Sequence, residues 1–163
     1  MVFDAHTHLF HPKVVENVKK KTEMVQRLGL QTHGVESRTS GSSLEEELKA
    51  SRVIGGLVLP TTLAHEVQAV NDAAFQRVKD FPLLHTAGTL HPDAEDIPGI
   101  LDIFEQRRIR AIKFCSFSQR FSLQDPKTFE MLELIQARNA GSESGFFLIF
   151  DTLMPADRYF GSD

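Results

Sequence analysis

The sequence has one cysteine, Cys115, no tryptophan and no long apolar run. One cysteine excludes a disulfide within the chain and is typical of a reducing compartment, and no leader-like segment precedes Val2, so we expect a cytoplasmic protein. The apolar stretches, such as 146–150, fall far short of the roughly 20 residues that a membrane-spanning helix needs, which argues against a membrane partner. The net charge of -4 offers no general attraction for phosphate backbones, so nucleic acid is not an expected partner.

What the sequence does have is an alternation of short apolar runs and helical patterns. The 163 residues, 41% of them hydrophobic and 25% charged, are typical of one globular domain over 1–163. Apolar runs at 2–3, 56–60, 82–89, 111–114 and 146–150 are predicted strands. Helices are predicted over 12–30, 43–51 and 64–79, and after the capping residues Asp96 and Asp125, with a loop over 31–43.

Strands that alternate with helices indicate βαβ units and hence a parallel sheet covered by helices. A (β/α)8 barrel of the TIM type needs about 250 residues, so five units in this chain fit a barrel truncated to about five βα units. A complete doubly wound domain is the alternative. The sequence ends in 155–163, shortly after a predicted strand, and a partial barrel would expose its first and fifth strands. We therefore expect a chain that is a fragment or that associates, for example as a homo-oligomer.

The strongest candidate site is Asp4-Ala5-His6-Thr7-His8, at the end of the first predicted strand. Residues two apart on a strand face the same side, so the imidazoles of His6 and His8 converge. Imidazole binds zinc and similar divalent ions, and the carboxyl ends of strands are where α/β sites assemble. Asp4 shares this parity and could orient a ligating histidine. The alternative is a pair of solvent-facing histidines near a terminus.

The segment from Asp4 to Phe10 resembles the opening motif of the amidohydrolase superfamily. The later segments resemble its amidohydrolase-related branch, which includes metal-dependent hydrolases and some decarboxylases. These segments are 57–60 for the second strand, 90–92 for the third-strand turn, 110–114 for the fourth strand, Asp125-Pro126 for a helix start and 147–152 for the fifth strand. The resemblance covers nearly the whole chain. Its first motif is fairly specific, and the order of the others supports it.

The resemblance implies that His6 and His8 are metal ligands, with zinc the expected metal. The family's fifth strand usually ends in a ligating histidine, where this chain has Asp151, which either replaces that ligand or caps the next turn. Lys113 on the fourth strand is expected to position a substrate carboxylate, or else to form a simple ion pair. His91 is a candidate substrate contact, or else an exposed turn residue. The ligands of the family's sixth and eighth strands have no counterpart up to residue 163.

The expected function is that of a metal-dependent hydrolase that cleaves an amide, lactone or ester bond of a small organic substrate with metal-activated water. Asp151 and Lys113 are the candidate catalytic residues. A metal-dependent decarboxylase of an aromatic or related carboxylic acid is the nearest alternative. A phosphoesterase of the histidinol-phosphatase or TatD nuclease type also begins with His-x-His. A truncated, non-catalytic family member is the remaining alternative.

Overall fold

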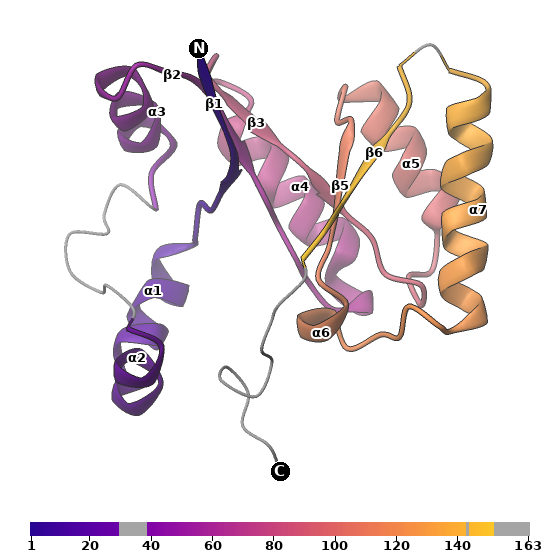
Figure 1. Cartoon of the computed structure of the whole chain (residues 1–163), viewed down its shortest axis with the longest axis horizontal. Coiled ribbons are helices and arrows are strands. Elements are labelled where there is room, and N and C mark those ends of the chain that lie inside the picture. Colours follow the sequence, from indigo (N-terminus) through magenta and orange to yellow (C-terminus); the bar gives the residue numbers. More distant parts are fainter. Residues whose placement is uncertain (30–38, 143, 152–163) are drawn as a thin grey trace.

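The computed structural model describes residues 1–29, 39–142 and 144–151. In chain order the elements are β1 (Val2–Thr7), α1 (Pro12–Lys19), α2 (Thr22–Leu28), α3 (Gly41–Ala50), β2 (Val53–Val58), the 3-10 helix η2 (Ala64–Glu66), α4 (Val67–Val78), β3 (Leu84–Thr86), β4 (Gly88–Thr89), α5 (Ile97–Gln106), β5 (Ala111–Phe114), α6 (Ser116–Gln119), α7 (Pro126–Ala140) and β6 (Phe147–Phe150) (Figure 1). The predicted alternation of strands and helices is confirmed.

The strands form two parallel sheets that share one segment of chain. The strand order is β1-β2-β3 in the first sheet and β4-β5-β6 in the second. Each neighbouring pair is parallel, so the fold is mixed α/β with parallel strands. Only Ala87 separates β3 from β4, and its backbone N–H still donates to the carbonyl of Val58 in β2, at 2.9 Å. The segment 84–89, predicted as one strand, therefore pairs with β2 first and with β5 afterwards.

The helices α5 and α7 begin where the sequence predicts. The Asp96 side chain accepts a hydrogen bond from the backbone N–H of Gly99, at 2.9 Å, and the Asp125 side chain accepts one from Lys127, also at 2.9 Å. A proline follows each of these residues within the first two helical positions. Proline there removes no helical hydrogen bond, and the aspartate pairs a backbone donor that the helix leaves free.

Other predicted boundaries are wrong in detail. The helix expected over 12–30 is divided into α1 and α2 by Lys20 and Lys21, which with Lys19 make a run of like charges. Helix α3 begins earlier than predicted, because Ser40, not Ser43, caps it, accepting a hydrogen bond from the N–H of Ser43 at 3.5 Å. Most of the loop predicted over 31–43 lies outside the described residues. Helix α6, directly after β5, was not predicted.

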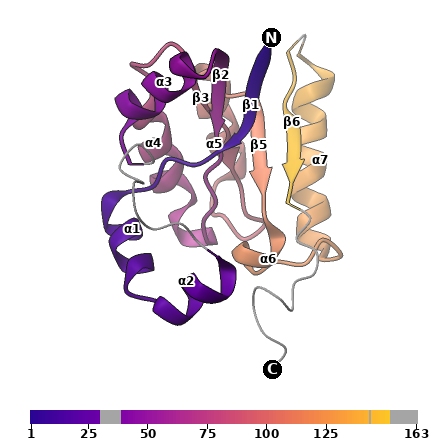
Figure 2. The ribbon, with the colours of Figure 1, turned by 60° about the vertical axis from the view of Figure 1, so that its left-hand side comes forward.

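Most of the apolar core lies between the strands and the helices α3, α4, α5 and α7, which Figures 1 and 2 show on one side of the strands. Ile112 and Phe114 of β5 have no exposed surface and pack with residues of α5 and α7. A smaller group covers the other face: Leu57, Leu59, Ala87 and Ala111, with Ile149 partly buried against them. The strand residues therefore sort into a helix-covered face and a second face, which carries the candidate site described below.

The outer strands β1 and β6 leave apolar side chains in solvent. Phe147 is 54% exposed and Phe150 is 40% exposed on β6, and Val2 is 61% exposed on β1. Each of these strands pairs with one neighbour in the described part of the chain, so one row of backbone groups stays open on each. Within that same part, the helices are all too short or too polar to cross a bilayer.

Candidate active site

The two histidines of the first motif lie side by side at the end of β1. Their ring centroids are 5.1 Å apart, with the ring planes at 77°. Thr7, between them, is 2% exposed and lies on the helix-covered face, where Gly56 neighbours both Thr7 and Leu48 of α3. Since side chains alternate along a strand, His6 and His8 project to the opposite face. The predicted convergence of the two imidazoles is thus present in the structure.

Asp4 has a different role from the one expected of it. Its carboxylate accepts a hydrogen bond from the backbone N–H of His6, at 3.0 Å, where the sequence suggested contact with an imidazole. The pairing of β1 with β2 changes register between Asp4 and Thr7, so the simple two-residue alternation that placed Asp4 beside the histidines does not hold across this point. Asp4 shapes the backbone that carries His6.

His8 is held in a defined orientation. Its Nδ1 lies 3.2 Å from the carbonyl oxygen of Leu59, and its ring stacks on that of Phe10 with centroids 5.4 Å apart. A carbonyl only accepts hydrogen bonds, so Nδ1 carries the proton and Nε2 keeps its lone pair. Burial, followed by the nearby His6 and then Lys113, lowers the pKa of His8 below its ordinary value of 6.5, against the opposing effects of the Leu59 hydrogen bond and Asp151. At neutral pH this imidazole is uncharged, which is the form that binds metal.

Lys113 and Asp151 lie at the same rim of the sheet as the histidines. The side chain of Lys113 has no exposed surface, and its ammonium forms an ion pair with the Asp151 carboxylate. The backbone N–H of Asp151 donates to the carbonyl of Phe114 at 2.9 Å, which extends the pairing of β6 with β5. Both charged groups act electrostatically on His8. The curvature of the strands therefore brings the ends of β1, β5 and β6 together, although β1 and β6 are far apart in sequence.

The donor set for a metal is incomplete in the part of the chain that the structure describes. His6 and His8 offer two imidazoles, a ligand type that is common in zinc sites. Asp151, the expected third ligand, is instead bound to Lys113. Within residues 1–29, 39–142 and 144–151, no group of three or more His, Cys, Asp or Glu side chains is placed to hold a metal ion. The two histidines thus fit as nitrogen ligands of a metal, whereas the candidate carboxylate ligand, Asp151, is paired with Lys113.

His91 is neither exposed nor free to bind in this structure. It is 5% exposed, and its ring meets that of Phe121 edge-on with centroids 5.4 Å apart. Its Nδ1 accepts a hydrogen bond from the backbone N–H of Asp93 at 3.1 Å, and its Nε2 donates to the carbonyl of Gln119 at 2.9 Å. Both ring nitrogens are therefore used inside the protein. The expectation of an exposed turn histidine is wrong, and no ring nitrogen is left over for a substrate.

A cavity of about 330 Å³ adjoins His8 on the side of α4. Its walls are mostly apolar and come from the segment after β1, from α1, from the end of β2 and from α4; they include Leu9, Phe10, Val14, Val58, Val70 and Ala74. Arg77 of α4 fixes the segment after β1 by donating to the carbonyls of Leu9 and Phe10, at 2.8 and 2.7 Å. The volume is at the low end of the range for small-molecule pockets, which is roughly 300–1,000 Å³.

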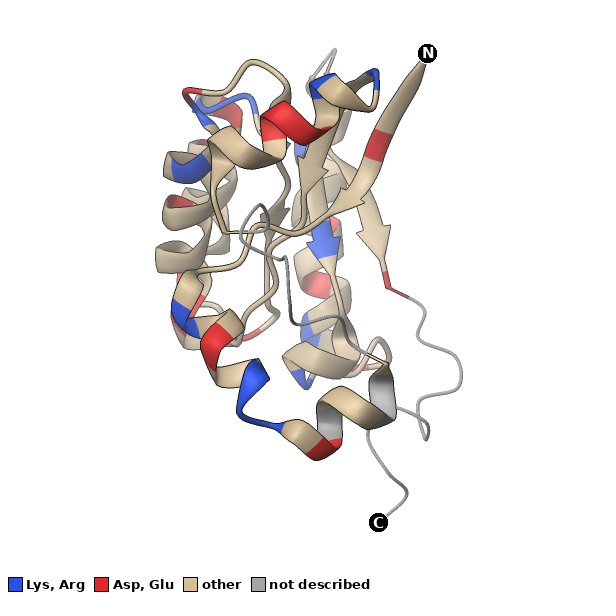
Figure 3. Ribbon diagram, turned by 90° about the vertical axis from the view of Figure 1, so that its left-hand side faces the viewer, with Lys and Arg blue, Asp and Glu red and all other residues tan. Residues whose placement is uncertain are grey.

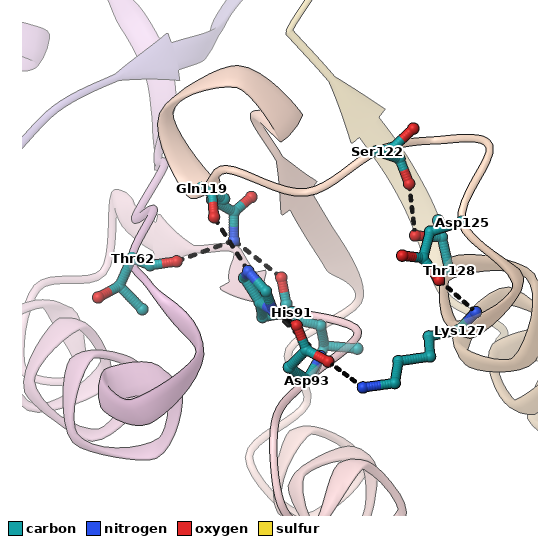
Figure 4. Close-up of polar contacts among 9 residues, drawn as sticks. Thr62, His91, Asp93, Gln119, Ser122, Asp125, Lys127 and Thr128 are labelled. Atoms are coloured by element: carbon teal, nitrogen blue, oxygen red, sulfur yellow. Dashed lines mark hydrogen bonds and ion pairs between the residues drawn. The ribbon is translucent and has the colours of Figure 1, made fainter.

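Sequence reasoning missed a buried polar group beneath the rim. Gln119, 1% exposed at the end of α6, makes hydrogen bonds to several segments at once (Figure 4). Thr89 of β4 and Asn71 of α4 belong to the same network. The sequence carries little signal for it, because Gln119 stands in the polar run 116–120, which resembles an ordinary surface loop.

Acidic and basic residues are interspersed over the side of the molecule that Figure 3 shows. Blue and red ribbon segments follow one another along the helices there. The candidate site combines the imidazoles of His6 and His8 with the ion pair of Lys113 and Asp151, in a protein of modest net charge, -4.

No protein-family model matches the sequence, and no curated protein matches it. The structure is similar to the crystal structure of a probable 2-pyrone-4,6-dicarboxylic acid hydrolase from Acinetobacter baumannii with citric acid bound. The TM-score is 0.51, the sequence identity is 14%, and the similarity covers 92% of this chain and 57% of that one. At this identity the likeness shows the fold alone, and this chain spans little more than half the length of its neighbour.

Proposed function

We propose that this chain carries the first part of the active site of a metal-dependent hydrolase that acts on a small organic substrate. The observation that carries the proposal is that His6, His8, Lys113 and Asp151 lie near one another at the carboxyl ends of strands of the two parallel sheets. The carboxyl ends of parallel strands are where α/β enzymes assemble their sites. The resemblance of the Asp4–Phe10 motif to the amidohydrolase superfamily supports the same assignment.

We further propose that the sheet is the beginning of a (β/α)8 barrel. Three features support this: the parallel order of the strands, the helices on one face, and the open apolar edges of β1 and β6. The neighbour with the same fold is considerably longer, since the similarity covers 57% of it. In a barrel, later strands would cover both edges and could add ligands to His6 and His8.

In this proposal His6 and His8 hold a divalent metal, most simply zinc, with His8 offering Nε2. A bound divalent metal supplies a Lewis acid and lowers the pKa of water at the site. The chain's own residues bind and orient the substrate. Lys113 provides a buried positive charge that attracts a substrate carboxylate, which then competes with Asp151 for the ammonium. Asp151, once released from Lys113, is available to accept a proton or to serve as the third ligand.

The proposed substrate is a small molecule with at least one carboxylate and a hydrolysable amide, lactone or ester bond. Lys113 supports the carboxylate, because a buried ammonium stabilises a buried anion. The structural neighbour is a probable hydrolase of a dicarboxylic acid and has citric acid bound. The mostly apolar cavity beside His8 offers room for the rest of such a molecule.

The test is the metal content of three purified proteins: the wild type, a His6→Ala/His8→Ala double variant, and a His65→Ala variant as a control on an exposed histidine outside the site. After dialysis against zinc, mass spectrometry should find stoichiometric zinc in the wild type and in the control, and none in the double variant. A wild type without bound zinc would contradict the proposed function. Assays on lactones, amides and hydroxybenzoates then separate hydrolysis from decarboxylation.

A second candidate is a non-catalytic chain that keeps the fold. The observation in its favour is that Asp151 is bound to Lys113 and that no three-ligand group is formed among the described residues. This candidate predicts zinc-free wild-type protein whose stability does not change when zinc is added. The same dialysis experiment therefore decides between the two functions.

A further inference from the structure

We propose that Gln119 is the positioning residue of the candidate site. Its side chain joins the segments that follow β2, β4 and β5, and it thereby keeps Lys113 inside the sheet against Asp151. The importance of that position for a reaction rests on the proposed function. The mechanical role itself is independent of it and can be tested without any activity.

The Gln119 amide reaches three segments of the chain. Its Nε2 donates to the carbonyl of Leu90, at 2.8 Å, and to that of Thr62, at 3.1 Å. Its Oε1 accepts a hydrogen bond from the backbone N–H of Cys115, at 2.8 Å. These partners follow β4, β2 and β5, respectively, and Gln119 is 1% exposed. A buried side chain that pairs backbone groups from three loops fixes their relative positions, because each broken bond would leave a polar group unpaired away from water.

Gln119 also holds the backbone that directly follows the Lys113 side chain, at two points. One of the two Nε2 hydrogens of Gln119 is shared with the Thr89 hydroxyl, at 3.2 Å, and this hydroxyl donates to the carbonyl of Lys113, at 3.1 Å. The Cys115 N–H, two residues further on, is held by Oε1 at the same time. The end of β5 is thereby tied to one amide group through both Lys113 and Cys115.

The backbone of Gln119 extends the network to the next loop. Its carbonyl accepts the hydrogen bond from His91 Nε2, and the backbone N–H of Asp93 pairs with the other ring nitrogen (Figure 4). The Asp93 carboxylate forms an ion pair with Lys127 in the first turn of α7, at 2.5 Å. His91 therefore holds the backbone of Gln119 in place, and this contact is consistent with the burial of the His91 ring.

Glutamine suits this position because it offers a donor and an acceptor on one uncharged group of the right length. In Gln119→Met the chain length is similar, but the carbonyls of Leu90 and Thr62 and the N–H of Cys115 lose their partner. In Gln119→Glu the acceptor for Cys115 remains, but both amide hydrogens are gone and a carboxylate faces carbonyl oxygens. Both variants should loosen the end of β5 and let the Lys113 side chain reach solvent.

The experiment is trace acetylation of folded protein with the N-hydroxysuccinimide ester of acetic acid, followed by mass spectrometry of the digest. Labelling of Lys113 is divided by that of the exposed Lys79 in the same sample. The wild type should protect Lys113. We expect Gln119→Met and Gln119→Glu to raise the ratio on the order of tenfold or more, since several buried groups lose their partners. Gln124→Met, the same change at an exposed glutamine, should leave the ratio unchanged.

A second control separates positioning from general loss of stability. Ile135→Ala removes buried side chain from α7, and Ile135 is not among the hydrogen-bond partners of the Gln119 amide. The proposal is overturned if Lys113 labelling does not rise in the Gln119 variants, or if Ile135→Ala raises it equally at a matched loss of melting temperature. Should the Gln119 variants fail to fold, hydrogen exchange of the wild type decides, because the Cys115 amide must then be among the slowest to exchange.

The two proposals can fail separately. If the wild type binds no zinc, the proposed function is contradicted. The role of Gln119 still stands if Lys113 is protected in the wild type and loses this protection in Gln119→Met. Conversely, a zinc-binding wild type in which Gln119→Met leaves Lys113 protected keeps the proposed function and removes the role of Gln119.

Discussion

Lys113 and Asp151 form an ion pair in which the two partners differ sharply in their access to solvent. The Lys113 side chain is fully buried, whereas that of Asp151 is 28% exposed. Removing either partner therefore leaves the other in a different environment. We therefore expect the loss of stability to depend on which partner is removed.

Asp151→Ala is expected to destabilise the protein more than Lys113→Met. The first change leaves a buried ammonium without its partner, which costs about 3–5 kcal/mol when no water can replace it. The second leaves a carboxylate that water partly solvates and fills the space with an apolar chain, so we expect a loss of about 1 kcal/mol. Urea denaturation of both variants measures the difference. Equal losses would show that Lys113 reaches solvent.

His8 should make stability depend on pH just below neutrality. Its pKa is lowered from 6.5, chiefly by burial, so between the folded pKa and 6.5 the unfolded chain binds a proton that the folded chain does not. The contribution is fully present above pH 6.5 and is lost as the pH falls through the folded pKa. His8→Gln, which keeps a donor near the Leu59 carbonyl, should flatten the free energy of unfolding in this window. An unchanged pH profile in His8→Gln would contradict the assignment.

The buried hydroxyl of Thr7 lowers the free energy of unfolding, and a single substitution can remove this effect. Its hydroxyl is buried and, among the described residues, has no hydrogen-bond partner. Thr7→Val replaces the hydroxyl by a methyl group of similar size, so we expect the free energy of unfolding to rise by about 1 kcal/mol. Thr128→Val is the matched control, because the Thr128 hydroxyl donates to the carbonyl of Ser122 at 2.8 Å, and it should lose about the same amount. Chemical denaturation of the two variants should give opposite signs.

The open edge of β6 should make the isolated chain associate. Phe147 is 54% exposed on β6, whose outer side has no partner strand among the described residues. Apolar strand edges pair readily with other chains. Phe147→Lys should weaken association roughly tenfold or more, because a charge opposes edge pairing and apolar burial is lost. Phe129→Lys, an equally exposed position on α7, serves as the control. Sedimentation velocity over a concentration series measures both; if the wild type is monomeric throughout, the edge is protected in another way.

The sequence was sufficient for the features that depend on local pattern. Asp96 and Asp125 mark helix starts because each cap is a short-range device. His6 and His8 meet because two residues of spacing on a strand set a direction. Lys113 and Asp151 share their rim because parallel strands place their carboxyl ends together.

The remainder depends on contacts between residues that are distant in sequence. No local pattern marks the burial of Gln119, since its partners Thr62 and Leu90 lie 57 and 29 residues away. His91 beside a proline has the pattern of an exposed turn, and its burial depends on contacts with Phe121 and the carbonyl of Gln119, 28 or more residues away. Likewise, Asp151 has the chemistry of a metal ligand, and the sequence alone does not reveal that Lys113 binds it.

The division of one strand at Ala87 affects the order in which parts of the protein lose their structure on unfolding. His6 and His8 lie at the end of a strand of the sheet before this residue, whereas Lys113 lies on β5 and Asp151 follows β6, both in the sheet after it. Leu57, Leu59, Ala87 and Ala111 form a small cluster across the junction, but the larger clusters lie beneath the helices of one sheet or the other. A small rotation about the junction would therefore leave the two larger clusters packed while it parts the histidines from the lysine. Mild heat or denaturant should therefore abolish any activity of this site before it exposes either core.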